Sequence, residues 1–245
     1  MRGRLGAVVA TVLTLALVGG CASKKPAIGT PVVATIAVVP ATDPALLTLR
    51  NENGVVFLSP ITSAGFYLDS KEKAKQFIAA MASRRMPLAD KLTRKVVAVI
   101  AAKGFRIDVL TDVPRPQDDP DDVDDGKLRT QADAILQLRV DELGVFSSKF
   151  STDYLPRVNI QAKLYVRSVD DSVYDENLSF GVDARAGDTF SIVSDPRFAY
   201  PTFESLLGRA DEIAAVLDNG IDALAELVAA QLIDALAVKT RRPVP

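Results

Sequence analysis

Cys21 is the only thiol in the chain, and none of the 245 residues is a histidine. A thiol can act as a nucleophile, as a metal ligand or as a point of covalent attachment. Without histidine, a Ser-His-Asp triad, a Cys-His dyad and the common zinc sites cannot be assembled. We therefore expect covalent attachment at Cys21 and no catalytic residue, metal or other cofactor. A hydrolase that uses only carboxylates for catalysis also stays open as the lowest-ranked hypothesis, although no motif places a pair of acids for it.

The residues before Cys21 have the order of a secretory signal peptide. Two arginines are followed by an apolar run over residues 6–18 and by two glycines, with no acidic residue among them. A membrane-spanning helix is the alternative, but it needs roughly 20 consecutive apolar residues, and this run is shorter. The pattern predicts a signal peptide over residues 1–20, cut between Gly20 and Cys21.

The four residues at the cleavage point are an aliphatic residue, two small residues and a cysteine, Val18, Gly19, Gly20 and Cys21. This sequence resembles the lipobox of bacterial lipoproteins. The resemblance implies diacylglycerol on the Cys21 sulfur and acylation of the amino group that cleavage frees. Because each buried methylene contributes about 0.8 kcal/mol, two or more acyl chains hold a protein on a bilayer. An ordinary signal peptide ending beside a free cysteine is the alternative.

The residue after Cys21 implies a location. Gram-negative lipoproteins that stay in the inner membrane tend to carry aspartate there, whereas this chain has Ala22. The resemblance therefore implies the inner leaflet of the outer membrane, facing the periplasm, if the organism is Gram-negative. Residues 21–31 contain two prolines and a glycine, which predicts a flexible tether behind the lipid.

The charge of the mature chain bears on its partners. Removal of Arg2 and Arg4 leaves 27 Lys and Arg against 31 Asp and Glu. A nucleic-acid-binding protein normally has a basic face, so we expect no nucleic-acid partner.

Three short motifs suggest chemistry, and each has a simpler explanation. Ser70 and Lys73 match S-x-x-K of penicillin-recognising enzymes, but their two further elements are missing, so Ser70 is better explained as a helix cap. The acidic loop Asp118–Gly126 holds six aspartates and could attract Ca²⁺, but it lacks the EF-hand ligands and reads as solvated. Two basic pairs could contact anionic headgroups or a partner, but a solvated helix end and a frayed tail explain them better: Arg84 with Arg85, and Arg241 with Arg242.

Hydrophobic periodicity predicts how the first half of the chain folds. Residues 32–39 read as a buried strand, and residues 46–58 as a hairpin around Asn53-Gly54. Helices are predicted over residues 70–86 and, after Pro87, over residues 88–103, followed by a strand at 105–110.

In the second half, a short helix is predicted over residues 127–132 and a strand over 134–145. Strict alternation over residues 157–167 and 174–182 predicts antiparallel strands with one buried and one wet face. A long helix should begin at Thr202 or Ser205 and reach Val238, with Gly220 as a candidate kink and an apolar stripe of Ile213, Leu217, Ile221, Leu224, Val228 and Leu232. The stripe could instead serve oligomerisation.

Together these elements predict an α/β (α+β) domain over residues 32–238 and a disordered tail over 239–245. The expected architecture is a mixed sheet with a C-terminal antiparallel meander, paired helices and a long C-terminal helix. Segments such as "IAVVP" at 36–40 and "ADAILQLRV" at 132–140 resemble those of curli-secretion lipoproteins, penicillin-binding-protein activators and the first domain of the Tol-system periplasmic protein. Similar folds host different functions, so the resemblance implies a fold and no specific role.

Two functions follow as hypotheses. The first is a non-enzymatic, lipid-anchored accessory factor for assembly, secretion or regulation that contacts an envelope protein. The second is a small-ligand or lipid-binding lipoprotein of an envelope transport system. Its support is the wet face of the predicted meander together with an aromatic group that could line a pocket or simply pack in the core: Phe190, Phe198, Tyr200 and Phe203.

Overall fold

The computed structural model describes residues 33–44, 47–52, 60–84, 87–116, 122–148, 152–168 and 171–240. Cys21 with its neighbours and the predicted tether lie outside these ranges. Of the predicted tail over 239–245, residues 241–245 lie outside them, whereas residues 239 and 240 belong to the last helix. Among the residues described, no helix combines the length and apolar character that crossing a bilayer requires.

A seven-stranded mixed sheet forms the centre of the fold, in the order β3-β1-β4-β5-β6-β7, with β2 beside the far half of β4. Strands β3, β1 and β4 are parallel, and β4, β5 and β6 form the antiparallel meander that the alternation predicted. The strands are β1 (Thr35–Val39), β2 (Thr48–Asn51), β3 (Arg106–Val109), β4 (Ala134–Ser147), β5 (Leu155–Val166), β6 (Asp171–Gly181) and β7 (Ser191–Ile192). The predicted α/β class is confirmed.

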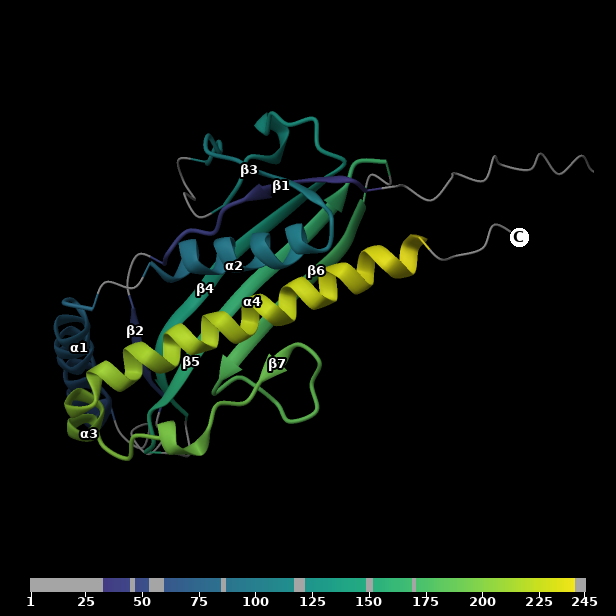
Figure 1. The fold of residues 1–245 in the computed structure, drawn as a ribbon. Coiled ribbons are helices and arrows are strands. Elements are labelled where there is room, and N and C mark those ends of the chain that lie inside the picture. Colours follow the sequence, from purple (N-terminus) through teal and green to yellow (C-terminus); the bar gives the residue numbers. More distant parts are fainter. Residues whose placement is uncertain are drawn as a thin grey trace, which may run out of the picture.

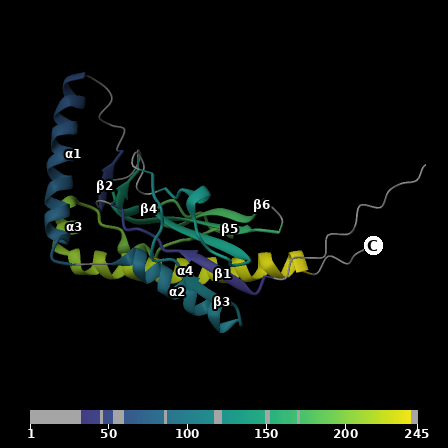
Figure 2. The same cartoon turned by 90° about the horizontal axis from the view of Figure 1, so that it is seen from above.

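Helices cover one face of this sheet. Helices α2 and α4 lie side by side across it, whereas α1 stands at one end of the sheet and projects away from them (Figures 1 and 2). The helices are α1 (Pro60–Met81), α2 (Leu88–Ala102), α3 (Phe203–Gly208) and α4 (Ala210–Thr240), with short 3-10 turns η2 (Asp125–Lys127) and η3 (Pro196–Phe198).

The core lies between α2, α4 and the sheet. Every residue of the predicted α4 stripe is buried there, which confirms its packing role. Helix α4 runs unbroken through Gly220, which has a packing function rather than the expected kink. A Cβ at Gly220 would lie only 2.7 Å from the Phe180 ring, so the missing side chain lets α4 approach β6.

Helix α1 differs from its prediction at both ends. It begins at Pro60, so Ser70 lies inside the helix and does not cap it. Proline is favoured in a first helical turn because its fixed φ suits the helix and its missing N–H costs nothing there. The helix ends at Met81 rather than at the predicted Met86. Just after this end, Arg84 pairs with Asp211 at 2.6 Å and donates a hydrogen bond to the Ala80 carbonyl oxygen.

Three further expectations are corrected. Strand β2 pairs in parallel with β4, and the second half of the expected hairpin lies outside the described residues. In place of the short helix predicted over 127–132, the structure has η2 and then a segment without regular secondary structure, in which the Asp133 carboxylate accepts a hydrogen bond from the Thr35 N–H. The long C-terminal helix is divided at Arg209: Thr202 caps α3 by accepting from the Ser205 N–H, and α4 then continues.

Candidate functional site: the open face of the sheet

The face of β4, β5 and β6 opposite α2 and α4, here called the open face, carries polar side chains. On β5 the alternation is complete: Val158, Ile160, Ala162 and Leu164 are buried towards the helices, and the residues between them are only partly buried. Arg157, Asn159, Gln161 and Lys163 therefore share the open face, as the sequence pattern predicted.

A β-bulge in β4 places an acid beside Arg157. Val140 pairs with Ile160 and Glu142 with Asn159, so Asp141 is an extra residue without a partner in the ladder. An extra residue shifts the alternation by one position. Glu142 consequently lies on the open face, and Leu143 and Val145 continue the buried side.

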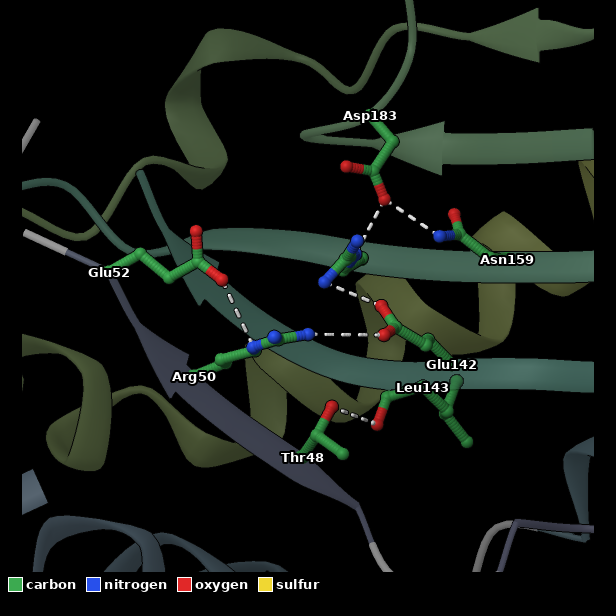
Figure 3. Close-up of polar contacts among 8 residues, drawn as sticks. Thr48, Arg50, Glu52, Glu142, Leu143, Asn159 and Asp183 are labelled. Carbon is green, nitrogen blue, oxygen red and sulfur yellow. Dashed lines mark hydrogen bonds and ion pairs between the residues drawn. The ribbon is translucent and has the colours of Figure 1, made fainter. Parts of the chain in front are cut away.

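Arg157 is the centre of the polar cluster on this face, because it pairs with both Glu142 and Asp183. Figure 3 labels these two carboxylates and the neighbouring Asn159. The Arg157 guanidinium lies 2.5 Å from a Glu142 carboxylate oxygen and 2.5 Å from Asp183, on the loop after β6. The same guanidinium stacks 4.8 Å from the centre of the Phe146 ring. Only 16% of the Arg157 side chain is exposed, so these contacts hold it in one orientation.

Two neighbours extend this Arg157 cluster. Arg50 of β2 forms two ion pairs. Its guanidinium lies 3.7 Å from the other Glu142 carboxylate oxygen and 3.2 Å from the Glu52 carboxylate. Asn159 donates from Nδ2 to Asp183 at 2.7 Å, and its buried Oδ1 accepts no hydrogen bond from the described part of the chain. The cluster thus links four segments far apart in sequence and keeps one unused acceptor.

A second polar group lies further along β5. Lys163 pairs with Asp175 of β6 at 3.1 Å and lies 4.8 Å from the centre of the Tyr165 ring. Hydrogen bonding to Tyr165 and Asp175 raises the pKa of the Lys163 ammonium, and Gln161 donates to Asp175 at 3.3 Å. Charges of both signs are therefore fixed in rows across the open face.

The cluster presents paired charges and an amide whose positions are held by contacts on several sides. Glu142 and Asp183 are each paired with Arg157, so both carboxylates already have a cationic partner. No group of three or more metal-ligating side chains occurs among the residues described. A fixed pattern of charges and amides suits binding of a polar partner.

The S-x-x-K residues form a different arrangement from the one the motif requires. Lys73 pairs with Asp69 at 2.7 Å, and this hydrogen bond raises the pKa of the Lys73 ammonium. A lysine base needs a lowered pKa, so the geometry opposes that role. The Ser70 hydroxyl is buried and has no hydrogen-bond partner in the described residues.

The remaining candidates from the sequence are scattered. Most of the acidic loop lies outside the described residues, and its Asp124 pairs with Lys127 at 2.6 Å. Arg84 pairs with Asp211, so it is not free for headgroups. Cys21, Gly20, Ala22, Arg85, Arg241 and Arg242 all lie outside the described residues.

The four aromatics serve packing rather than a common pocket. Tyr200 is fully buried, exchanges backbone hydrogen bonds with Tyr154 and donates its hydroxyl to Glu212 at 3.3 Å. Burial is the main reason that the Tyr200 pKa rises to about 12. Phe203 is buried against Tyr154, whereas Phe190 and Phe198 are partly buried.

A hollow of about 630 Å³ lies elsewhere, between β3 and the segment that leads to β4. Asp108, Asp112, Lys127 and Arg129 contribute both signs of charge to its lining. Its volume lies within the range of small-ligand sites, roughly 300–1,000 Å³. Sequence reasoning missed this hollow, because it depends on Lys127 and Arg129 lying close to residues 108–114, which no local pattern shows.

Comparison with known proteins gives no family. No family model and no curated protein matches the sequence. A Xanthomonas campestris protein of family model DUF330 has a similar structure, with a TM-score of 0.43, 11% identity, and coverage of 89% of this chain and 93% of that one. Lipoprotein GNA1162 from Neisseria meningitidis has a TM-score of 0.27, 16% identity, and coverage of 76% and 96%. These similarities are too low to carry over a function.

Proposed function

We propose that this protein is a lipid-anchored accessory factor of the bacterial cell envelope, which acts without catalysis by contacting another envelope protein. The signal peptide and the lipobox-like sequence at Cys21 support the anchoring and the location. The open face of the sheet is the contact surface in this proposal. Outer-membrane sorting through Ala22 belongs to the same proposal.

The observation that carries the proposal is the Arg157 cluster. A guanidinium held by two carboxylates and one aromatic ring needs little ordering when a partner binds, so less binding free energy is lost. Fixed charges of alternating sign give specificity for one partner and suppress others. The unpaired Asn159 oxygen provides an acceptor for a donor on that partner.

Crosslinking in intact cells tests this contact. A photo-crosslinking residue at Gln161, on the open face, should capture a defined envelope protein, whereas the same residue at Ala230, exposed on α4, should not. Arg157→Glu should abolish the Gln161 crosslink, and Arg197→Glu, an exposed arginine paired with its neighbour Asp195, should leave it unchanged. Equal capture from Gln161 and Ala230 would contradict the assignment of the open face.

The anchor has its own test. Cys21→Ser should release the protein from membranes, and globomycin, an inhibitor of lipoprotein signal peptidase, should leave the precursor uncut. If the Cys21→Ser protein still fractionates with membranes, the proposed lipid anchor is contradicted. The crosslinking test of the open face would remain valid, because it does not depend on the anchor.

A second function is favoured by the hollow beside β3. Its size and mixed charges would suit a small polar ligand or a lipid headgroup brought by an envelope transport system. Lipid extraction and mass spectrometry of the purified Cys21→Ser protein would distinguish the two functions. A stoichiometric bound lipid favours ligand binding, and its absence favours protein contact.

A further inference from the structure

Strand β3 is the end strand of the sheet, and β1 is its only strand neighbour among the described residues. Figure 1 shows β3 beside β1. Arg106 and Leu110 donate their backbone N–H groups to Ala34 and Val38, towards β1, at 3.0 and 2.9 Å. Because backbone groups alternate along a strand, those of Ile107 and Val109 point away from β1. Within the described residues they make no hydrogen bond on that side. Such an edge is a template for another strand.

The side chains of this edge are suited to pairing. Val109 is 42% exposed, whereas Ile107 and Phe105 are partly buried on the same, helix-covered side. Arg106 and Asp108 are both exposed on the opposite side. One side of the edge is therefore apolar, and the other carries two opposite charges two residues apart.

The sequence of β3 and its preceding residue, Phe105 to Val109, is complementary to itself when run antiparallel. With Ile107 opposite Ile107 of a second copy, each Arg106 faces the other copy's Asp108, and each Phe105 faces a Val109. Directly opposed residues of this kind have Cβ atoms about 4.5–5.5 Å apart, close enough for ion pairs. A shift of two residues in β3 would instead bring Asp108 against Asp108 or Arg106 against Arg106.

Within the described residues, the charged groups near this edge leave Arg106 and Asp108 available for ion pairs with a second copy. Asp133, which lies near Arg106, already accepts from Ala34 N, Thr35 N and Thr35 Oγ1 at 2.9, 2.8 and 2.7 Å. Neither Arg106 nor Asp108 forms an ion pair with any described residue. Arg129, which lines one hollow together with Asp108, is exposed and also lacks an ion pair within the described ranges.

From this self-complementary edge we infer that the protein forms a symmetric dimer through β3, in which two sheets join into one. The two-fold axis runs normal to the sheet through the Ile107 pair. The two copies of Val33, the first described residue after the predicted tether, then lie at equal height along that axis, which suits two anchors in one bilayer. The pairing itself does not depend on the proposed function.

Sedimentation of the mature chain carrying Cys21→Ser tests the dimer. The wild-type edge should give a concentration-dependent monomer–dimer equilibrium. Asp108→Arg places four arginines together and should raise the dimer dissociation constant about tenfold or more. The double variant Arg106→Asp/Asp108→Arg restores opposite charges across the edge and should recover the wild-type constant.

Disulfide trapping tests the register. Arg106→Cys and Asp108→Cys proteins, each also Cys21→Ser and therefore free of other thiols, should crosslink when mixed, because these positions face each other. Each variant alone should crosslink much less, since like positions are diagonal rather than opposed. The proposal is overturned if the mature chain is monomeric at all concentrations, if the charge-swapped double variant fails to recover although it melts like wild type, or if mixing adds no crosslink.

Discussion

Alternate residues of β5 meet two different environments. Ile160 and Leu164 have no exposed surface beneath α2 and α4, whereas Arg157 and Lys163 lie on the open face and hold their charges in ion pairs. Burial of a large apolar side chain contributes about 1.5–3 kcal/mol, whereas exposed ion pairs contribute about 0–1 kcal/mol. The helix-covered face therefore supplies most of the stability, and the open face is left to arrange charge.

The largest expected effect comes from the covered face. Leu224→Ala, at a fully buried position of α4, should lower the free energy of unfolding by about 3 kcal/mol, since it removes buried methyl groups and leaves a cavity. Urea denaturation measures this change. Leu68→Ala is the matched control, because Leu68 is 67% exposed, and it should change stability by less than about 0.5 kcal/mol. Equal losses would remove the distinction between covered and exposed apolar residues.

Gly220→Ala should also destabilise the covered face, by about 1–3 kcal/mol. Alanine favours helix by about 1 kcal/mol, but its Cβ would lie 2.7 Å from the rigid Phe180 ring. Thermal melting measures the change, and the smaller side chain of Phe180→Leu should reduce the penalty in the double variant. Gly208→Ala, with nothing within 4 Å of its added Cβ, should not be destabilising. A stabilised Gly220→Ala protein would show that α4 does not depend on this close approach.

On the open face, Arg157→Gln should lower the free energy of unfolding by about 1–2 kcal/mol, because the 16%-exposed guanidinium is lost from both carboxylates. Among the described residues, Glu142 would keep only the longer contact with Arg50, and Asp183 only the amide of Asn159. High salt should reduce the stability difference between wild type and Arg157→Gln, because salt partly screens the attraction between Arg157 and the two carboxylates in the wild type. Urea denaturation at low and high ionic strength provides the measurement. A loss as large as that of Leu224→Ala would contradict the assignment of stability to the covered face.

The smallest effect concerns the ion pairs at the outer seam between α2 and α4. Lys91 contacts Asp218 and Asp222 at 2.6 and 3.0 Å. Burial opposes ionisation of Asp222, but hydrogen bonds from Lys91 and Lys95 outweigh it and lower the pKa of Asp222. Burial likewise disfavours charged Lys91, but its bonds to the two aspartates raise its pKa.

Asp222→Asn should therefore cost less than about 1 kcal/mol near neutral pH, because these side chains are partly exposed. The lowered Asp222 pKa gives stability that is present above the unfolded value of about 3.9 and is lost as pH falls through the folded pKa. The raised Lys91 pKa gives stability that is present below about 10.4 and is lost as pH rises through the folded value. Denaturation from acid to alkaline pH should show the wild-type advantage shrinking at both ends, and a constant advantage would contradict the seam ion pairs.

Much of the fold was predictable because burial follows local periodicity. The period-2 pattern of 157–167 and the 3.6-period stripe of 213–232 each determine which side of an element is apolar. The bulge at Asp141 also has a signal in the sequence: apolar residues stand at 134, 136, 138 and 140 and then at 143 and 145. That slip predicts an extra residue and places Glu142 on the wet face.

The partners of the polar residues were not predictable. Arg50, Glu142, Arg157 and Asp183 come from four segments, and only the parallel pairing of β2 with β4 brings Arg50 to Glu142. The start of α1 at Pro60 and the role of Gly220 were missed for a related reason, since each depends on a neighbour or a context that a local pattern does not show.

The sequence by itself determined the types and faces of the main elements, and it supplied the lipobox-like signal on which anchoring is predicted, because these properties lie in contiguous residues. The tertiary structure alone decided which charges meet on the open face and which strand is left at the edge. Those features arise from contacts between residues many positions apart in the sequence. Such contacts are individually weak and impose no local periodicity, so a sequence pattern does not show them.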